Sequence, residues 1–297
     1  VKKVPNRIVI VGAGAVGAEF ADVFEAFGAE VTLVEMMPQI LPVEDEEVAK
    51  VVEGAFRKRG MKILTGTKVA SLDRSGRKGM RLVVQRDGKE ETLETDAVLM
   101  AVGRAPNVEN LGLEEAGVEL ANGFIRVDGY GRTTAEGIYA IGDVAGPPML
   151  AHKASHEGIV AAEHIAGREP HPLRRDAIPN ATYCHPEVAS VGLTERAARE
   201  AGHDVVVGKF PFSANGRALT AGHPDGFVKI VAERTYGEIL GVHVVGHHAT
   251  ELLHELHLGR MLEATLEEVA HTVHAHPTLS EAAMEAAFVA LGRPLHI

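Results

Sequence analysis

The first third of the chain alternates short apolar runs with longer amphipathic stretches. Apolar runs with few charged side chains, which are typical of buried parallel strands, occur at residues 7–12, 30–35 and 97–103. Residues 15–28 carry apolar side chains at helical spacing, and Gly28 is placed to end that helix. A second helical stretch, residues 44–60, is acidic at its start and basic at its end, as the helix dipole favours. This order predicts an α/β domain over residues 1–105.

The pattern then becomes more irregular. Residues 81–94 predict a hairpin that turns at Asp87–Gly88. Residues 106–175 form a connecting segment with its own elements, namely a strand within residues 133–143 and a helix at residues 149–167.

A third pattern begins at about residue 176. Short segments of alternating apolar and polar residues predict an antiparallel sheet. Helical patterns follow at residues 249–261, 265–271 and 280–290. The predicted fold class is therefore α/β plus α+β, with a C-terminal α+β domain over residues 176–297.

Composition narrows the class of protein further. The 297 residues exceed one typical domain, and the 45% hydrophobic content is enough for proper cores. A formal net charge of −11 argues against a nucleic-acid partner, and no apolar run is long enough to predict a membrane span. The one cysteine, Cys184, excludes an intramolecular disulfide and a cysteine zinc cluster, and it fits a reducing compartment. Because the chain begins at Val1 rather than Met, we expect a processed or truncated piece.

A glycine-rich motif lies between the first predicted strand and helix. In G-x-G-x-x-G, Gly12 permits the tight turn, Gly14 lets the backbone approach a pyrophosphate, and Gly17 lets helix and strand pack closely. Glu35 ends the second strand, where a carboxylate accepts hydrogen bonds from ribose hydroxyls and repels a 2′-phosphate. We therefore predict a Rossmann-like domain that binds NAD rather than NADP. The alternative is a glycine-rich turn without a ligand.

Asp143 follows Gly142 at the predicted end of a strand, where ligands of open α/β sheets bind. A turn aspartate explains the same residue more simply.

One predicted helix carries His248, Glu251, His254 and His257, which recur every three residues. A metal site there is conceivable, but a solvated or interface face is the favoured interpretation, and no metal is predicted.

His276 precedes a proline, and Glu281 follows it by five residues. Glu281 is able to accept a hydrogen bond from the imidazole, fix its tautomer and raise its basicity. Thr278 and Glu281 also match a capping box, in which Glu281 accepts only a backbone N–H. Spacing leaves both interpretations open.

Taken together, the motifs resemble those of the dihydrolipoamide dehydrogenase family, within the flavin-dependent disulfide reductases. The segments that carry the resemblance follow the family's order: "GAGAVGAE", "AVGRAPNVENLGLEEAGVEL", "GIYAIGDV", "MLAHKASHEG", "HPEVASVGLTE", "KFPFSANGRA" and "HAHPTLSEA". The resemblance implies an NAD-binding domain (1–105), a remnant of the FAD-binding and central domain (106–175) and a dimerisation domain (176–297).

The resemblance also implies roles for single residues. His276 would be the catalytic acid–base and Glu281 its orienting partner, acting on the flavin site of the other subunit of a homodimer. The implied NAD contacts are Gly12, Ala13, Gly14, Ala15, Val16, Gly17, Ala18, Glu19, Glu35, Val69 and Gly103. The implied FAD contacts are Asp143, Met149, Leu150, Ala151 and His152. The implied partner is the acyltransferase core of a 2-oxoacid dehydrogenase complex, in the cytoplasm or, in a eukaryote, the mitochondrial matrix.

Two features of the family are missing from the sequence: the N-terminal half with a first flavin glycine motif, and the redox-active cysteine pair. We therefore expect the chain alone to bind NAD and to be inactive with dihydrolipoamide. The histidine-rich stretch 247–257 also departs from the small and apolar residues expected there. The alternatives are another flavin-dependent disulfide reductase, such as a glutathione reductase-like enzyme, and a non-catalytic NAD-binding or docking module.

Overall fold

The computed structural model describes residues 3–75 and 79–297 and divides the chain into two units. The larger unit comprises Val1–Val102 and Pro179–Ile297, and the smaller comprises Gly103–Ile178. Each unit has its own core.

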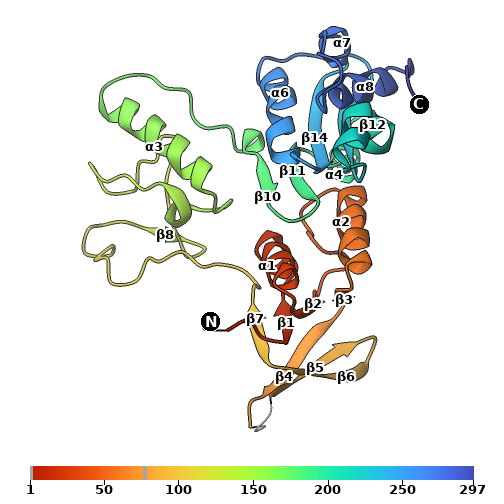
Figure 1. Ribbon diagram of the computed structural model, residues 1–297. Coiled ribbons are helices and arrows are strands. Elements are labelled where there is room, and N and C mark those ends of the chain that lie inside the picture. Colours follow the sequence, from red (N-terminus) through yellow and green to blue (C-terminus); the bar gives the residue numbers. More distant parts are fainter. Residues whose placement is uncertain (1–2, 76–78) are drawn as a thin grey trace. The chain divides into compact units, whose positions relative to one another are not determined.

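A parallel sheet of four strands forms the centre of the first segment of the larger unit (Figure 1). Its strands, in spatial order, are β3 (Lys62–Leu64), β2 (Glu30–Val34), β1 (Arg7–Val11) and β7 (Ala97–Met100). All four strands run in the same direction, so their carboxyl ends meet at one edge. This is the edge at which open α/β sheets bind ligands.

The two faces of this sheet have different covers. Helices α1 (Ala15–Ala26) and α2 (Glu46–Lys58) pack on the face that carries Ile8 and Ile10. Val9 and Val11 point to the opposite face, because side chains alternate along a strand. That face is covered by an antiparallel sheet of β4 (Lys68–Asp73), β5 (Met80–Arg86) and β6 (Lys89–Thr95). Burial on both faces explains the nearly continuous apolar runs in the sequence.

The C-terminal segment is built on a five-stranded antiparallel sheet (Figure 1). Its spatial order is β10 (Asn180–Thr182), β11 (Glu187–Gly192), β14 (Ile239–Gly246), β13 (Phe227–Glu233) and β12 (Val205–Pro211). The helices of this segment are α4 (Glu195–Glu200), α5 (Gly216–Ala221), α6 (Ala249–Met261), α7 (Leu266–His271) and α8 (Glu281–Ala290). The last three share one core with the sheet, which contains Ile230, Leu253 and Ala286.

Helix α8 lies unusually close to strand β12. A Cβ atom placed on Gly208 would lie 1.8 Å from the carbonyl oxygen of Ala286, so only glycine fits there. This contact fixes the depth of α8 against the sheet. The first residue of α8 is Glu281, and its position is therefore set by packing rather than by a loop.

A buried ion cluster joins α2 to the C-terminal sheet. The side chain of Lys229, on β13, is only 2% exposed. Its Nζ lies 3.0 Å from Asp45 Oδ2, 2.8 Å from Glu47 Oε2 and 3.0 Å from Glu195 Oε2. Burial alone lowers the pKa of Lys229, but the three carboxylates outweigh it and raise that pKa above its ordinary value. Asp45 is also the N-cap of α2, where it accepts the N–H of Glu47.

The smaller unit contains two short strands and one long helix. Its elements are β8 (Leu120–Ala121), β9 (Phe124–Ile125), the 3₁₀ helices η1 (Gly142–Ala145) and η2 (Arg175–Ala177), and α3 (Ala151–Ile165). Its core is small and contains Val118, Ile125 and Ala140.

The strand predicted within residues 133–143 is wrong. The described residues of this stretch make a single bridge, between Arg132 and Tyr139, and the chain then enters η1. A strand needs a neighbour that continues the hydrogen-bond ladder, and here residues 131–133 pair with residues 138–140 only around this one bridge. Asp143 therefore lies in a 3₁₀ turn rather than at the end of a strand.

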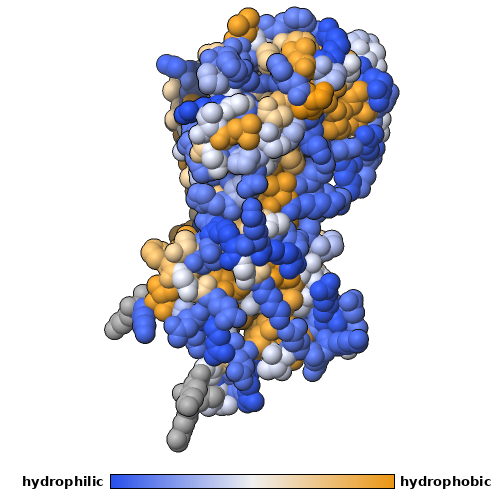
Figure 2. Space-filling view, turned by 45° about the vertical axis from the view of Figure 1, so that its right-hand side comes forward, coloured by the Kyte–Doolittle hydropathy of each residue, from blue (hydrophilic) through white to orange (hydrophobic). Residues whose placement is uncertain are grey.

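The predicted class, α/β plus α+β, is confirmed. Among the described residues, no helix is long and apolar enough to cross a membrane. Hydrophilic residues predominate on the face drawn in Figure 2, with separate hydrophobic areas between them.

We predict that Lys229→Met destabilises the chain by about 3–5 kcal/mol, because Asp45 is left buried without its cation. Urea unfolding measures this change in free energy. Lys62→Met is the matched control, since its partner Glu91 is half exposed, and its effect should stay below about 0.5 kcal/mol. Equal losses in the two variants would contradict a central role for the Lys229 cluster.

Candidate functional site

The glycine-rich turn lies at the carboxyl edge of the parallel sheet. Gly12 has φ +97°, and a Cβ atom on it would lie 2.4 Å from the carbonyl oxygen of Ala101. A Cβ atom on Gly17 would lie 1.8 Å from the carbonyl oxygen of Gly12, so α1 packs directly on the turn. A Cβ atom on Gly14 would meet nothing within 4 Å. The first and third glycines are thus required by the fold, whereas the second leaves open space at the start of α1.

Gly14 is the N-cap of α1 and has no side chain to satisfy the first N–H groups of that twelve-residue helix. The first N–H groups of a helix have no acceptor inside it, and the helix dipole favours an anion there. An open cap with these properties fits the pyrophosphate of a dinucleotide.

Glu35 is only 8% exposed and contacts the glycine-rich turn. Its Oε2 accepts the N–H of Ala13 at 2.7 Å, and its Oε1 accepts the N–H of Met37 at 2.8 Å. The sequence did not reveal this support of the turn. Each carboxylate oxygen has a second acceptor position, so the role toward ribose hydroxyls stays a prediction.

The other residues of the predicted nucleotide site occupy different environments. Ala15 and Val16 are exposed at the start of α1, whereas Ala13 and Ala18 are buried. Glu19 Oε1 accepts the N–H of Tyr183 at 2.9 Å.

Two further predicted NAD contacts lie outside α1 and its turn. Val69 packs against the core beneath the antiparallel sheet. Gly103, with φ +139°, is the first residue of the smaller unit.

His276 and Glu281 are in direct contact. Nδ1 of His276 lies 2.8 Å from Glu281 Oε1, while Glu281 Oε2 accepts the N–H of Thr278 at 2.8 Å. The Thr278 hydroxyl donates to the carbonyl of Ala275, so only half of the predicted capping box forms. The two interpretations of Glu281 are therefore compatible, because each uses a different carboxylate oxygen.

The protonation of Glu281 determines which imidazole nitrogen carries the proton. Burial by itself raises the pKa of Glu281, but the Thr278 N–H and the His276 imidazole outweigh it and hold that pKa below its ordinary value. An ionised carboxylate only accepts hydrogen bonds, so Nδ1 of His276 donates. In the neutral ring, Nε2 then keeps the free lone pair. The side chain is 77% exposed, so this nitrogen is accessible to a substrate.

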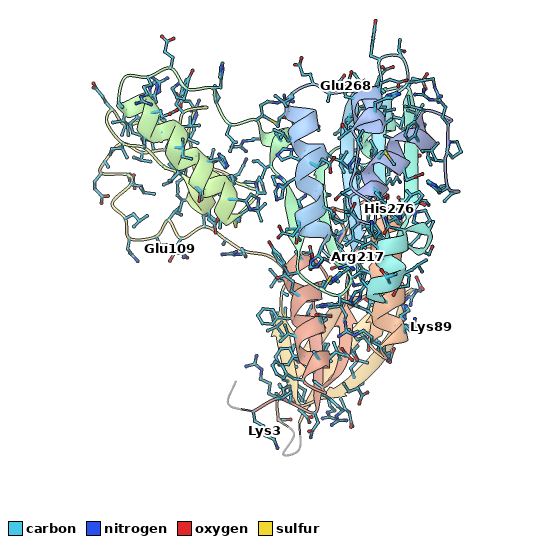
Figure 3. All side chains as sticks on the ribbon, turned by 45° about the horizontal axis from the view of Figure 1, so that its top comes forward. Lys3, Lys89, Glu109, Arg217, Glu268 and His276 are labelled. Atoms are coloured by element: carbon cyan, nitrogen blue, oxygen red, sulfur yellow. The ribbon has the colours of Figure 1, made fainter. Side chains whose placement is uncertain are left out.

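The loop that carries His276 is fixed from several sides. The side-chain amide of Asn215, the N-cap of α5, donates to the carbonyl of Thr278 at 2.9 Å. Figure 3 labels His276 and, on α5, Arg217. Glu285, one turn after Glu281 on α8, is buried and makes a second pair: Nδ1 of His296, which lies beyond the end of the helix, is 2.5 Å from its Oε1.

The predicted flavin contacts all belong to the smaller unit. Asp143 Oδ2 accepts from Arg104 Nη2 at 3.3 Å, and the Asp143 side chain is 40% exposed. Met149 and Leu150 lead into α3, whose first two residues are Ala151 and His152. The exposed carboxylate is able to accept hydroxyl groups, and the start of the fifteen-residue helix favours a negatively polarised group. These features fit part of a flavin site.

Sequence reasoning missed two residues of this region, Lys153 and Glu157, which hold the backbone of Gly142 from α3. A Lys and a Glu four residues apart on a helix were the available signal. Their shared target became visible only in three dimensions.

The histidine-rich segment shows no metal centre. Among residues 3–75 and 79–297, no group of three or more His, Cys, Asp or Glu side chains is arranged to hold a metal ion. His248 is the exposed N-cap of α6, and Glu251 and His254 are exposed on its surface. Half-buried His257 has its pKa lowered by burial and by the neighbouring His254 and Arg260.

Cys184 is fully buried, and its thiol donates to the carbonyl of Pro186. Burial raises the pKa of this thiol to about 12. A thiol that is buried and stays protonated is a poor nucleophile.

We predict a pH-dependent contribution of Glu281 to stability. A carboxyl group whose pKa is lowered by folding stabilises the folded state above its ordinary pKa, which is 4.5 for glutamate, and this contribution falls as the pH drops below that value. The difference in unfolding free energy between the wild type and Glu281→Gln should therefore shrink on acidification. Urea unfolding between about pH 6 and about pH 3 measures it. A constant difference across that range would contradict the assignment.

Proteins with similar sequences share one description. Dihydrolipoyl dehydrogenase of Rhizobium etli is 47% identical over 293 residues, which cover 98% of this chain and 61% of that protein. Dihydrolipoyl dehydrogenase of Mycobacterium leprae is 50% identical over 286 residues, which cover 96% of this chain and 61% of that protein. The chain thus spans about three fifths of the length of these relatives.

Solved structures agree with this likeness. LpdA from Mycobacterium tuberculosis superimposes with a TM-score of 0.88 at 34% identity, covering 97% of this chain and 62% of LpdA. The flavoprotein disulfide reductase RclA from Escherichia coli, in its Cu(II) complex, gives a TM-score of 0.87 at 26% identity, covering 97% of this chain and 65% of RclA.

Two family models divide the chain between them. Residues 1–158 match the pyridine nucleotide-disulphide oxidoreductase model, and residues 178–287 match the dimerisation domain of the same family. The chain belongs to the pyridine nucleotide-disulphide oxidoreductase family.

Proposed function

We propose that the chain is the NAD-binding and dimerisation part of a dihydrolipoyl dehydrogenase. Such an enzyme oxidises a protein-bound dihydrolipoyl group and passes the electrons through a disulfide and FAD to NAD. The observation that carries the proposal is the accessible His276 ring held by an ionised Glu281. The shared name of the curated relatives supports it. Because the chain spans about three fifths of those relatives, the activity is proposed for a longer protein that contains it.

The proposed NAD site is built on the turn before α1. The open space at Gly14 would admit the pyrophosphate, and Gly12 and Gly17 keep the turn and helix in place. Glu35 would accept the ribose hydroxyls with its remaining lone pairs while holding the N–H of Ala13. The other proposed contacts are Ala13, Ala15, Val16, Ala18, Glu19, Val69 and Gly103.

The proposed FAD contacts are Asp143 for the ribityl chain and residues 149–152 for the ring system. FAD, when bound, supplies a two-electron carrier between a disulfide and NAD. The contribution of the smaller unit is to hold an acceptor carboxylate and a helix start in fixed positions. These contacts make up only part of a flavin site.

His276 has the chemistry of a general base for a thiol. Its Nε2 would take the proton of a substrate thiol, which leaves the thiolate that attacks a disulfide. Glu281 stabilises the imidazolium that forms, through the hydrogen bond from Nδ1. Glu281 also accepts the Thr278 N–H, so the orientation of the His276–Glu281 pair is fixed before a substrate binds.

The proposed assembly is a homodimer, with the His–Glu pair serving the flavin site of the partner subunit. Its proposed larger partner is the lipoyl-bearing acyltransferase core of a 2-oxoacid dehydrogenase complex, in the cytoplasm or the mitochondrial matrix. The match of residues 178–287 to a dimerisation domain supports the first point.

We predict that the chain binds NAD at least about tenfold more tightly than NADP, since Glu35 repels a 2′-phosphate. Isothermal titration calorimetry with both nucleotides measures the ratio. Glu35→Arg should shift the ratio toward NADP. The ratio of the two affinities is the informative quantity, because Glu35→Arg also loses the hydrogen bond with Ala13 and should lower the affinity for both nucleotides. Equal affinities for the two nucleotides in the wild type would refute the role of Glu35.

We predict that His276→Ala slows NAD-linked oxidation of dihydrolipoamide by about 100-fold or more in the longer protein, because the general base is lost. Steady-state kinetics with dihydrolipoamide measures the rate. NAD affinity should stay unchanged and serves as the internal control. If the wild type binds NAD and shows no turnover, the non-catalytic docking module is the better description.

A further inference from the structure

We infer that Lys153 and Glu157 are positioning residues of the flavin side of the site: together they fix the backbone of Gly142 and so aim Asp143. This inference rests on the proposed role of Asp143 toward FAD. Neither residue is among the predicted cofactor contacts. Both act through the main chain of Gly142 rather than by touching the cofactor.

Three hydrogen bonds connect the pair to one glycine. Nζ of Lys153 donates to the carbonyl oxygen of Gly142 at 3.0 Å and to Glu157 Oε2 at 2.9 Å. The N–H of Gly142 donates to the same Glu157 oxygen at 2.7 Å. Both backbone groups of Gly142 are thus held by side chains of α3, with the cation on its carbonyl and the anion on its amide.

The conformation that these contacts hold is one that few residues adopt. Gly142 has φ +75°, in the left-handed region that favours glycine. A Cβ atom on it would lie 3.2 Å from the Cβ of Ala154, which is also on α3. A larger residue would therefore need a shift of a few tenths of an ångström at Ala154, in addition to the strained backbone. The left-handed step at Gly142 sets the direction in which the chain enters η1 and hence the direction of Asp143.

Burial shows that the pair is more than a surface ion pair. The Lys153 side chain is 1% exposed and that of Glu157 is 16% exposed. A buried ammonium group is costly unless its hydrogen bonds are made, and the pair would be expensive to keep for stability alone. Gly142 has no side chain, so packing cannot fix its position. The hydrogen bonds from Lys153 and Glu157 fix its backbone relative to α3 instead.

The same helix carries the other proposed flavin contacts. Ala151 and His152 are its first two residues, directly before Lys153 and five to six residues before Glu157. The hydrogen bonds to Gly142 therefore fix the position of Asp143 relative to the start of α3 within the smaller unit. The two groups of contacts keep their relative position without help from a bound cofactor.

The test separates positioning from plain stability. Two single variants, Lys153→Met and Glu157→Gln, are compared with a double variant, Lys153→Met with Glu157→Leu. Replacing a buried ion pair by apolar residues of similar size often preserves stability. The double variant leaves no unpaired charge, so it should lose less stability than either single variant, although the N–H and the carbonyl of Gly142 lose their partners. Glu163→Gln, on the same helix and paired only with Arg168, is the matched control.

Two measurements follow for each variant. NMR of the isolated chain reports hydrogen exchange of the Gly142 amide, which should be slow in the wild type and in Glu163→Gln, at least about tenfold faster in the double variant, and intermediate in the two single variants, which keep an acceptor oxygen at position 157. In the longer protein, the affinity for FAD, followed by flavin fluorescence, should fall about tenfold in the double variant. Unchanged amide exchange, or unchanged FAD affinity in a stable double variant, would overturn the inference. NAD binding and wild-type turnover test the proposed function separately, so failure of one is distinguishable from failure of the other.

Discussion

The arrangement of the larger unit depends on a single buried ammonium group, Nζ of Lys229. It collects carboxylates from three places in the sequence: the N-cap of α2, the first turn of α2 and the first turn of α4. The parallel sheet and the antiparallel sheet are thereby joined through charge as well as through the apolar core that they share. Because the same Asp45 also caps α2, one of the helices that cover the parallel sheet is anchored at its start by the C-terminal segment.

Local patterns were sufficient for most of the fold. The runs at β1, β2 and β7 are apolar because both faces of the parallel sheet are covered. This pattern lies within a few consecutive residues, so the sequence alone shows it. The strand predicted before Asp143 failed because a strand depends on a neighbour, which no local pattern contains. The Lys229 cluster was out of reach for the same reason, since Asp45 and Lys229 lie far apart in the sequence.

The candidate site was predictable where one motif held all of its parts. His276 and Glu281 are five residues apart, and the sequence placed them in reach of each other. The sequence left open whether Glu281 contacts the imidazole or a backbone N–H. In the structure it contacts both, one with each carboxylate oxygen. The hydrogen bond from the Ala13 N–H to Glu35 could not be predicted from the sequence, because it depends on how the ends of β1 and β2 meet. The hold of Lys153 and Glu157 on Gly142 required the same kind of three-dimensional information.

The burial of Cys184 has a consequence for any chemistry that passes through thiols. A protein that handles dithiols and disulfides would be vulnerable to mixed disulfides with its own cysteine, if that cysteine were reachable and ionised. Here the thiol is enclosed between the domains of the larger unit and its pKa is raised to about 12. The one thiol of this chain is thus kept away from the dithiols that His276 is proposed to deprotonate. A thiol reagent that acts on the folded protein should therefore leave Cys184 unmodified.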